Sequence, residues 1–220
     1  MIKYNFRRAR KKDIPFLAEI VIEAEKSNSN KLSYSTLFNI SQKTAYKWII
    51  KMFEAEIDYC EFSVSSFLVV EADGQLIGGF GGWIESFSEN IPSKILKSNL
   101  ILSTFSNKSI VYLKNKSQTI RNIIIEREAM TLQLEYLFIC EEHRGKNITD
   151  KLINIHINNE KRKLPALKKV QVQVFKNNIG AIKTYKKNGF KVKKSYKSNS
   201  KEILNYLPFG EKYLMEKHIN

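Results

Sequence analysis

The sequence predicts an α/β fold, an α+β mixed sheet with helices on its faces, and three observations support this prediction. Residues 169–175 alternate polar and apolar side chains, as a strand with one buried face does. Residues 67–80 form two strand-like runs around Asp73-Gly74, the strongest short hairpin signal in the chain. Towards the C-terminus, helical and strand patterns alternate, which suits a mixed sheet flanked by helices.

Length and composition favour one domain over residues 1–220. A chain of 220 residues can bury a sizeable core, and its 43% hydrophobic and 27% charged residues are ordinary for a globular protein. No apolar run is long enough to cross a bilayer, and the basic N-terminus lacks the apolar block of a signal peptide. We therefore expect a cytoplasmic protein with no membrane association.

The net charge of +15 arises from 37 basic and 22 acidic residues, and it would suit a polyanion such as nucleic acid. The lysines are dispersed, however, and no basic block alternates with aromatic residues. Nucleic acid is therefore a disfavoured partner, although the alternative stays open. Cys60, Cys140 and the three histidines lack the spacing of metal ligands, so we expect no metal.

The first half of the chain begins with a predicted strand over residues 4–9, and Asp13-Ile14-Pro15 then begins a helix. A polar stretch separates it from a second helical region over about residues 41–59. Four glycines lie between Gly78 and Trp83, after the hairpin. We interpret them as a bulged strand rather than a phosphate loop, because no helix clearly follows. Residues 85–129 contain few turn signals, so we expect helices there.

A candidate anion site follows the strand predicted to end at Ile139. A loop rich in hydrogen-bond donors, Arg144 to Thr149, leads into a helical pattern marked by Ile148, Leu152 and Ile155. Such a junction directs unpaired backbone N–H groups and the positive end of a helix dipole at one place. The loop therefore suits a pyrophosphate.

A second amphipathic helix is predicted after the strand at residues 169–175. Asn178 can cap it, Ala181 and Tyr185 share one face with Ile182, and Gly189 supplies a positive φ where the helix ends. Phe190 begins a short strand, and a final strand is expected near residues 212–217. An exposed final strand could pair with a second copy, which would give a homodimer.

These two segments together resemble the Gcn5-related N-acetyltransferase (GNAT) family. The helix matches the family pattern at Asn178, Ala181, Tyr185, Gly189 and Phe190, and Arg144 and Gly145 fit the family's pyrophosphate loop. The resemblance covers mainly residues 67–84 and 130–217. It implies an acyl-CoA N-acyltransferase fold, with residues of about 85–129 as a helical insertion before the central cofactor strand, where related enzymes often build the acceptor pocket.

The resemblance also implies an activity, the acetyl-CoA dependent transfer of an acetyl group to a primary amine by direct attack. The acceptor would be a small molecule or a peptide. The cofactor-binding residues that it implies are Leu137, Phe138, Ile139, Arg144, Gly145, Lys146, Asn147, Ile148, Thr149, Asn178, Ala181 and Tyr185. Asn147 and Thr149 stand where small residues are usual. Asparagine tolerates left-handed geometry, and a threonine hydroxyl could bind a phosphate.

Two catalytic roles follow from the same resemblance. Tyr185 is the candidate general acid for the departing thiolate, and the alternative is a core aromatic residue. Glu135 is the candidate base, directly or through water, with Glu85 and Glu128 as rivals. Strict alternation would place Glu135 on the face opposite Tyr136. A non-catalytic acyl-CoA or RNA-binding module on the same fold remains the alternative function.

Overall fold

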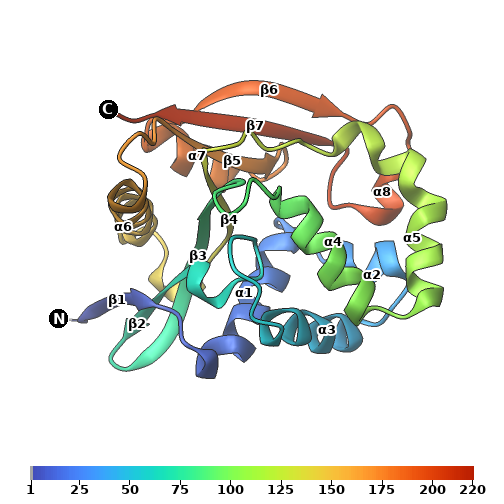
Figure 1. The fold of residues 1–220 in the computed structure, drawn as a ribbon, viewed down its shortest axis with the longest axis horizontal. Coiled ribbons are helices and arrows are strands. Elements are labelled where there is room, and N and C mark those ends of the chain that lie inside the picture. Colours follow the sequence, from blue (N-terminus) through green and yellow to red (C-terminus); the bar gives the residue numbers. More distant parts are fainter. Residues whose placement is uncertain (1) are drawn as a thin grey trace.

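Seven strands form one mixed sheet in the computed structural model, which describes residues 2–220 (Figure 1). Their order across the sheet is β1-β2-β3-β4-β5-β7-β6. Only β4 and β5 are parallel, and every other neighbouring pair is antiparallel. The strands are β1 (Tyr4–Arg8), β2 (Phe67–Ala72), β3 (Gln75–Ile84), β4 (Leu132–Ile139), β5 (Lys169–Phe175), β6 (Lys191–Lys197) and β7 (Glu211–His218). The predicted mixed α/β sheet is confirmed.

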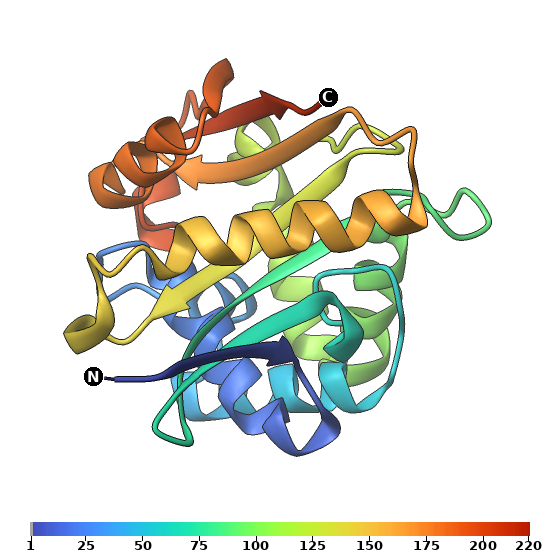
Figure 2. The same cartoon turned by 90° about the vertical axis from the view of Figure 1, so that its left-hand side faces the viewer.

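Helices cover both faces of this sheet. The longer ones are α1 (Ile14–Lys26), α3 (Gln42–Glu54), α4 (Ser93–Thr104), α5 (Asn107–Ile120), α6 (Ile148–Lys163) and α7 (Ile179–Lys187), and α2 (Ser33–Phe38) and α8 (Ile203–Tyr206) are short. One hydrophobic core lies between the sheet and α6, which crosses in front of the strands in Figure 2, and α7 contributes to it. The other core lies between the sheet and α1, α3, α4 and α5.

Several local predictions are confirmed by backbone geometry. Asp73 and Gly74 both have positive φ, 49° and 84°, as the turn of a two-residue hairpin requires. Residues 85–129 contain α4 and α5. The second helical region is shorter than expected, because α3 ends at Glu54 rather than near residue 59. Among helices within residues 2–220, none is both long and apolar enough to cross a membrane.

The position of the last strand corrects one prediction. Strand β7 lies between β5 and β6 and pairs with both, so it has no free edge for a second copy. The edges of the sheet are β1 and β6 instead. Most of β6 is exposed, and four of its seven residues are lysines, at positions 191, 193, 194 and 197. The predicted route to a homodimer through the final strand is therefore wrong.

A bulge in β4 changes which side chains share a face. Gly79 pairs with Phe138 and Gly81 with Glu135, so β4 carries one extra residue in this interval, and Tyr136 has a φ of 61°. Leu134 and Ile139 consequently pack in the same core beside α6, although strict alternation would place them on opposite faces. Tyr136 lies in the other core. The alternation expected from Gln133 to Phe138 is therefore wrong.

The glycines of β3 allow neighbouring groups to pack closely. A Cβ atom at Gly82 would lie 2.6 Å from His156 Nδ1, and one at Gly78 would lie 2.5 Å from the Phe138 carbonyl oxygen. The His156 ring is fully buried, and its Nε2 lies 2.8 Å from the Phe80 carbonyl oxygen. Burial lowers the pKa of His156 to about 3, so the ring is neutral and donates this hydrogen bond. The predicted bulge in the glycine-rich strand is confirmed on β3, whose pairing with β2 shifts beside Val70, whereas the bulge opposite Gly79 and Gly81 belongs to β4.

Replacing Gly82 should destabilise the protein. In Gly82→Ala the new methyl group would overlap His156 and Leu134, and we expect the free energy of unfolding to fall by about 1–3 kcal/mol. Gly180→Ala is the matched control, because its Cβ would meet nothing within 4 Å, and its effect should stay within about 1 kcal/mol. Urea denaturation of both variants measures the difference, and equal stabilities would contradict the packing argument.

Candidate functional site

Two adjoining pockets open where β4 and β5 separate. The strands pair only from Leu132 with Val170 to Leu134 with Val172, and beyond Leu134 the sheet offers β4 no partner on that side within residues 2–220. The larger pocket, about 450 Å³, borders the loop after β4, and we call it the loop pocket. The smaller, about 120 Å³, lies between the separated strands, and we call it the strand pocket. Both are lined by Ala24, Ser27, Leu137, Asn178 and Ala181.

The loop before α6 provides a run of free hydrogen-bond donors beside the loop pocket. Gly145 and Asn147 have φ values of 75° and 56°, and both line the pocket. The backbone N–H groups of residues 145–150 make no hydrogen bond to any group in residues 2–220. Three of these N–H groups lie in the loop and three in the first turn of a 16-residue helix, an arrangement that suits an anion. Asn147 adopts the left-handed geometry that asparagine tolerates.

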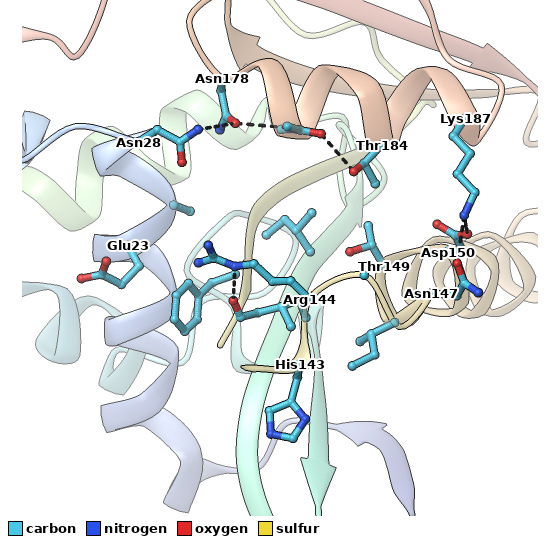
Figure 3. A pocket seen from close by; sticks show the side chains of 18 of the residues that line it. Glu23, Asn28, His143, Arg144, Asn147, Thr149, Asp150, Asn178, Thr184 and Lys187 are labelled. Atoms are coloured by element: carbon cyan, nitrogen blue, oxygen red, sulfur yellow. Dashed lines mark hydrogen bonds and ion pairs between the residues drawn. The ribbon is translucent and has the colours of Figure 1, made fainter. Parts of the chain in front are cut away.

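Charged and polar side chains surround this loop (Figure 3). Arg144 Nε donates to the Ile139 carbonyl oxygen over 2.9 Å. Lys187, from the end of α7, donates to Asn147 Oδ1 over 2.9 Å and to Asp150 over 2.8 Å. Thr149 also lines the pocket, and its hydroxyl has no hydrogen-bond partner in the described part of the chain. Arg144 therefore adds positive charge beside the free N–H groups, and Lys187 offsets the negative charge of Asp150 there.

The predicted residues come together here with few exceptions. Every residue implied for cofactor binding lines the loop pocket except Lys146 and Tyr185. Lys146 is exposed on the outside of the loop, and only its backbone N–H belongs to the free run. Tyr185 lines the strand pocket, as does Glu135. The rivals Glu85 and Glu128 line neither pocket.

Helix α7 carries Asn178, Ala181 and Tyr185 to the two pockets. Asn178 caps the helix as predicted, because its Oδ1 accepts from the Ala181 N–H over 3.2 Å. The same oxygen accepts from Asn28 Nδ2 over 3.1 Å, which connects α7 to the end of α1 (Figure 3). Gly189 ends the helix with a φ of 85°. The predicted start and end of this helix are confirmed.

Tyr185 is buried, and its ring centroid lies 5.7 Å from that of Phe190. Its hydroxyl forms no hydrogen bond with any other group in residues 2–220. Burial raises the pKa of Tyr185 well above 10, so the phenol is protonated at neutral pH. A protonated, unpartnered hydroxyl that faces a pocket can donate to a group bound there.

A buried charge network holds Glu135 in position. Arg127 Nη2 donates to both carboxylate oxygens of Glu135 over 2.8 Å and lies 3.1 Å from Glu61 Oε1. Lys97 lies 3.0 Å from the same oxygen of Glu61. Although burial opposes ionisation, the charges of Arg127 and Lys97 lower the pKa of Glu61 to about 2. This network connects the 85–129 insertion, which supplies Lys97 and Arg127, to β4.

The other two carboxylates considered as bases have structural contacts. Glu85 is buried and accepts from Trp83 Nε1 over 3.1 Å and from the Ser93 N–H and hydroxyl over 2.8 and 2.6 Å. Glu128 pairs with Lys169 and Lys193 near the surface. Within residues 2–220, no three His, Cys, Asp or Glu side chains gather as metal ligands would.

Three residues near the strand pocket were not predicted from the sequence. Glu25 and Lys212 line it, and Arg127 binds Glu135 beside it. Glu25 lies near the end of α1, and Lys212 comes from β7, almost two hundred residues later. Each of the three has another charged residue beside it in sequence, so each resembles part of an ordinary solvated surface. Glu25 and Lys212 come to the same pocket only in the folded chain.

Comparison with known proteins identifies similar sequences and folds. Residues 34–190 match the model of the Acetyltransferase (GNAT) family. No curated protein matches this sequence. Among solved structures, an N-acetyltransferase from Staphylococcus aureus Mu50 is similar with a TM-score of 0.66 and 16% identity, over 96% of this chain and 99% of that one.

Two further structures are similar over nearly their whole lengths. One crystal structure of an acetyltransferase has a TM-score of 0.62 and 20% identity, over 98% of this chain and 100% of its own. The structure of yncA from Salmonella typhimurium with its cofactor acetyl-CoA has a TM-score of 0.55 and 14% identity, over 99% of this chain and 95% of its own. At these identities the likeness establishes a shared fold.

Removing Arg127 should cost more stability than removing an exposed lysine. Arg127→Met would leave Glu135 without its partner and Glu61 with Lys97 alone, and we expect a loss of about 3–5 kcal/mol in the free energy of unfolding. Lys94→Met breaks the exposed pair with Glu126 and should cost less than about 1 kcal/mol.

Denaturant titration of both variants tests this expectation. Adding Glu135→Gln to Arg127→Met should recover part of the loss, because residue 135 then carries no unpaired charge while Glu61 keeps Lys97 as its partner. A stability of Arg127→Met within 1 kcal/mol of the unmodified protein would contradict the network as described.

Proposed function

Because this chain belongs to the Acetyltransferase (GNAT) family, we propose that it is an acetyl-CoA dependent enzyme that transfers an acetyl group to a primary amine by direct attack. The observation that carries the proposal is the run of six free backbone N–H groups at residues 145–150, next to a pocket of about 450 Å³. Family membership supports the proposed reaction class, and the free N–H groups beside the loop pocket support the proposed cofactor.

The loop pocket fits the chemistry of coenzyme A. A pyrophosphate needs several donors at one place, which the free N–H groups provide, and Arg144 adds positive charge while Lys187 neutralises Asp150. The Thr149 hydroxyl is one further donor. Beyond Leu134, the edge of β4 towards β5 is unpaired, so it can accept the amide groups of an extended pantetheine arm. We place that arm along Leu137, Phe138 and Ile139, which line the same pocket.

The bound thioester would supply an activated acetyl group. The uncharged amine nitrogen then forms a bond to the carbonyl carbon, the carbon–sulfur bond breaks, the nitrogen loses one proton, and the sulfur gains one. We assign the second proton transfer to Tyr185, whose hydroxyl is protonated and unpartnered beside the strand pocket. Solvent would then restore the tyrosine proton.

Glu135 is our proposal for the group that receives the amine proton. It lines the strand pocket with Tyr185, on the strand along which we place the cofactor. Both of its carboxylate oxygens already accept from Arg127, so direct contact with an amine would compete with that pair. We therefore propose that the proton reaches Glu135 through a water molecule.

Acetyl-CoA should stabilise the folded protein. At about a hundred times its dissociation constant, it should add roughly 2.7 kcal/mol to the free energy of unfolding, which differential scanning fluorimetry would detect as a higher Tm. Lys187→Met should weaken binding on the order of tenfold, because the Asp150 carboxylate would lose its partner and repel the phosphates beside it. Lys183→Met is the control, since that lysine is on the same helix but lines neither pocket.

Either of two outcomes would contradict this assignment of the cofactor site. One is the absence of any shift at millimolar acetyl-CoA, with salt-sensitive binding to RNA as the sign of the other function considered. The second is an equal effect of the two lysine variants, which would place the cofactor outside the loop pocket.

Tyr185→Phe should reduce turnover without reducing cofactor binding. The phenyl ring keeps the packing against Phe190 but removes the proton donor, so kcat should fall about 10²-fold or more with any amine that the enzyme accepts. Tyr196→Phe, on β6 and outside both pockets, should leave kcat unchanged. Thiol release from acetyl-CoA measures both. Unchanged kcat in Tyr185→Phe would remove this residue from the mechanism, and cofactor binding without turnover of any amine would favour a non-catalytic module.

A further inference from the structure

Two half-buried charges of opposite sign face the strand pocket without partners. Glu25, near the end of α1, and Lys212, in β7, both line it. Neither forms an ion pair or a side-chain hydrogen bond with any group in residues 2–220. The pocket's remaining carboxylate, Glu135, is already bound by Arg127. Charges that are withdrawn from water are normally paired in proteins, so these two are the groups left to meet a ligand.

Lys212 has an aromatic ring beside its ammonium group but no anionic partner. Its Nζ lies 4.4 Å from the centre of the Phe175 ring, which attracts a cation but carries no negative charge. Burial lowers the pKa of Lys212, and the charges of Glu25 and Glu135 oppose this shift without contacting the amine. An anionic group bound beside Lys212 would stabilise its charged form.

Glu25 is placed to complement the other end of the same ligand. Glu25 and Lys212 line the same pocket, yet they form no ion pair with each other. A small molecule bound in this pocket would therefore find both a carboxylate and an ammonium group without partners. Tyr185 lines the same pocket, and Leu137 and Ala181 line both pockets, so a bound amine would lie next to the proposed thioester site.

We propose that the acceptor is a small zwitterion with a primary amine and a carboxylate, the chemistry of a free amino acid, bound between Glu25 and Lys212. This inference rests on the proposed acetyltransferase function. Lys212 binds the carboxylate and Glu25 binds the ammonium group, whose extra proton passes to solvent before the uncharged amine attacks. The volume of about 120 Å³ favours a small molecule over a folded protein segment.

Other amines fit these two charges less well. A polyamine would bring a second ammonium group towards Lys212, where it would be repelled. A peptide N-terminus would carry an uncharged amide where Lys212 needs an anion, and so would leave that lysine unpaired. The strand pocket therefore discriminates by the group next to the amine rather than by the amine itself.

Matched acceptors test this proposal. We would measure thiol release with a panel of α-, β- and γ-amino acids and with their amides, which keep the amine but lack the carboxylate. The unmodified enzyme should prefer its best amino acid over the matching amide by at least about tenfold in kcat/KM, the effect of one charge-assisted contact. Lys212→Met should raise KM for the amino acid about tenfold and leave the amide unaffected.

Two further variants make the test specific. Lys212→Glu should reverse the preference towards the amide and towards diamines, because the group beside the amine then meets a negative charge. Lys194→Met is the control, since its Nζ also lies over an aromatic ring, that of Tyr196 at 4.9 Å, but outside both pockets. It should leave both acceptors unchanged.

The failure of this proposal can be told from the failure of the proposed function. If acetyl-CoA raises the Tm and amides are acetylated as well as amino acids, the zwitterion proposal is wrong while the acetyltransferase stands. Absence of turnover of every amino acid in the panel also overturns it. So does acetylation of Lys212 itself, found by mass spectrometry, because an acetylated lysine has no charge to bind a carboxylate. If acetyl-CoA does not bind, both proposals fail.

Discussion

The separation of β4 from β5 after Leu134 is the constraint on which the site depends. Where two parallel strands cease to pair, a buried strand edge becomes free, and the gap must be filled by something other than sheet. Here it is bordered by α7 on one side and the end of α1 on the other, with the two pockets between them. The bulge at Tyr136 accompanies the separation, because an extra residue increases the local twist of β4.

Local rules were enough to predict the elements at the rim of this site. Asn178 as a cap, Gly189 at a helix end and Asp73-Gly74 in a turn each require a backbone geometry that few residues adopt, so the residue type itself is informative. The same holds for the anion loop, since any strand that leads through a short turn into a helix leaves free N–H groups. These features depend on residues that are neighbours in sequence, so one sequence is enough to predict them.

The rest of the site depends on contacts between distant segments. Arg127 stands between two glutamates in sequence and looks like part of a solvated charged run, yet it binds the carboxylates of Glu61 and Glu135 below the surface. Lys212 lines the same pocket as Glu25 because β7 is inserted between β5 and β6, next to the strand that borders the pocket. The face of Glu135 was also unpredictable, because one extra residue in β4 changes the phase of the alternation and nothing in residues 132–139 signals it.

The open edge at β6 has a consequence for behaviour in concentrated solution. Exposed strand edges invite edge-to-edge pairing with other sheets, which leads towards aggregation. On β6, four lysines within seven residues surround the unpaired backbone groups with positive charge. Two copies that approached edge to edge would have to bring these charges together, and the repulsion would weaken as salt screened it. The dispersed lysines of this chain thus include a set that protects the sheet from self-association. These lysines favour solubility and have no role in the proposed reaction.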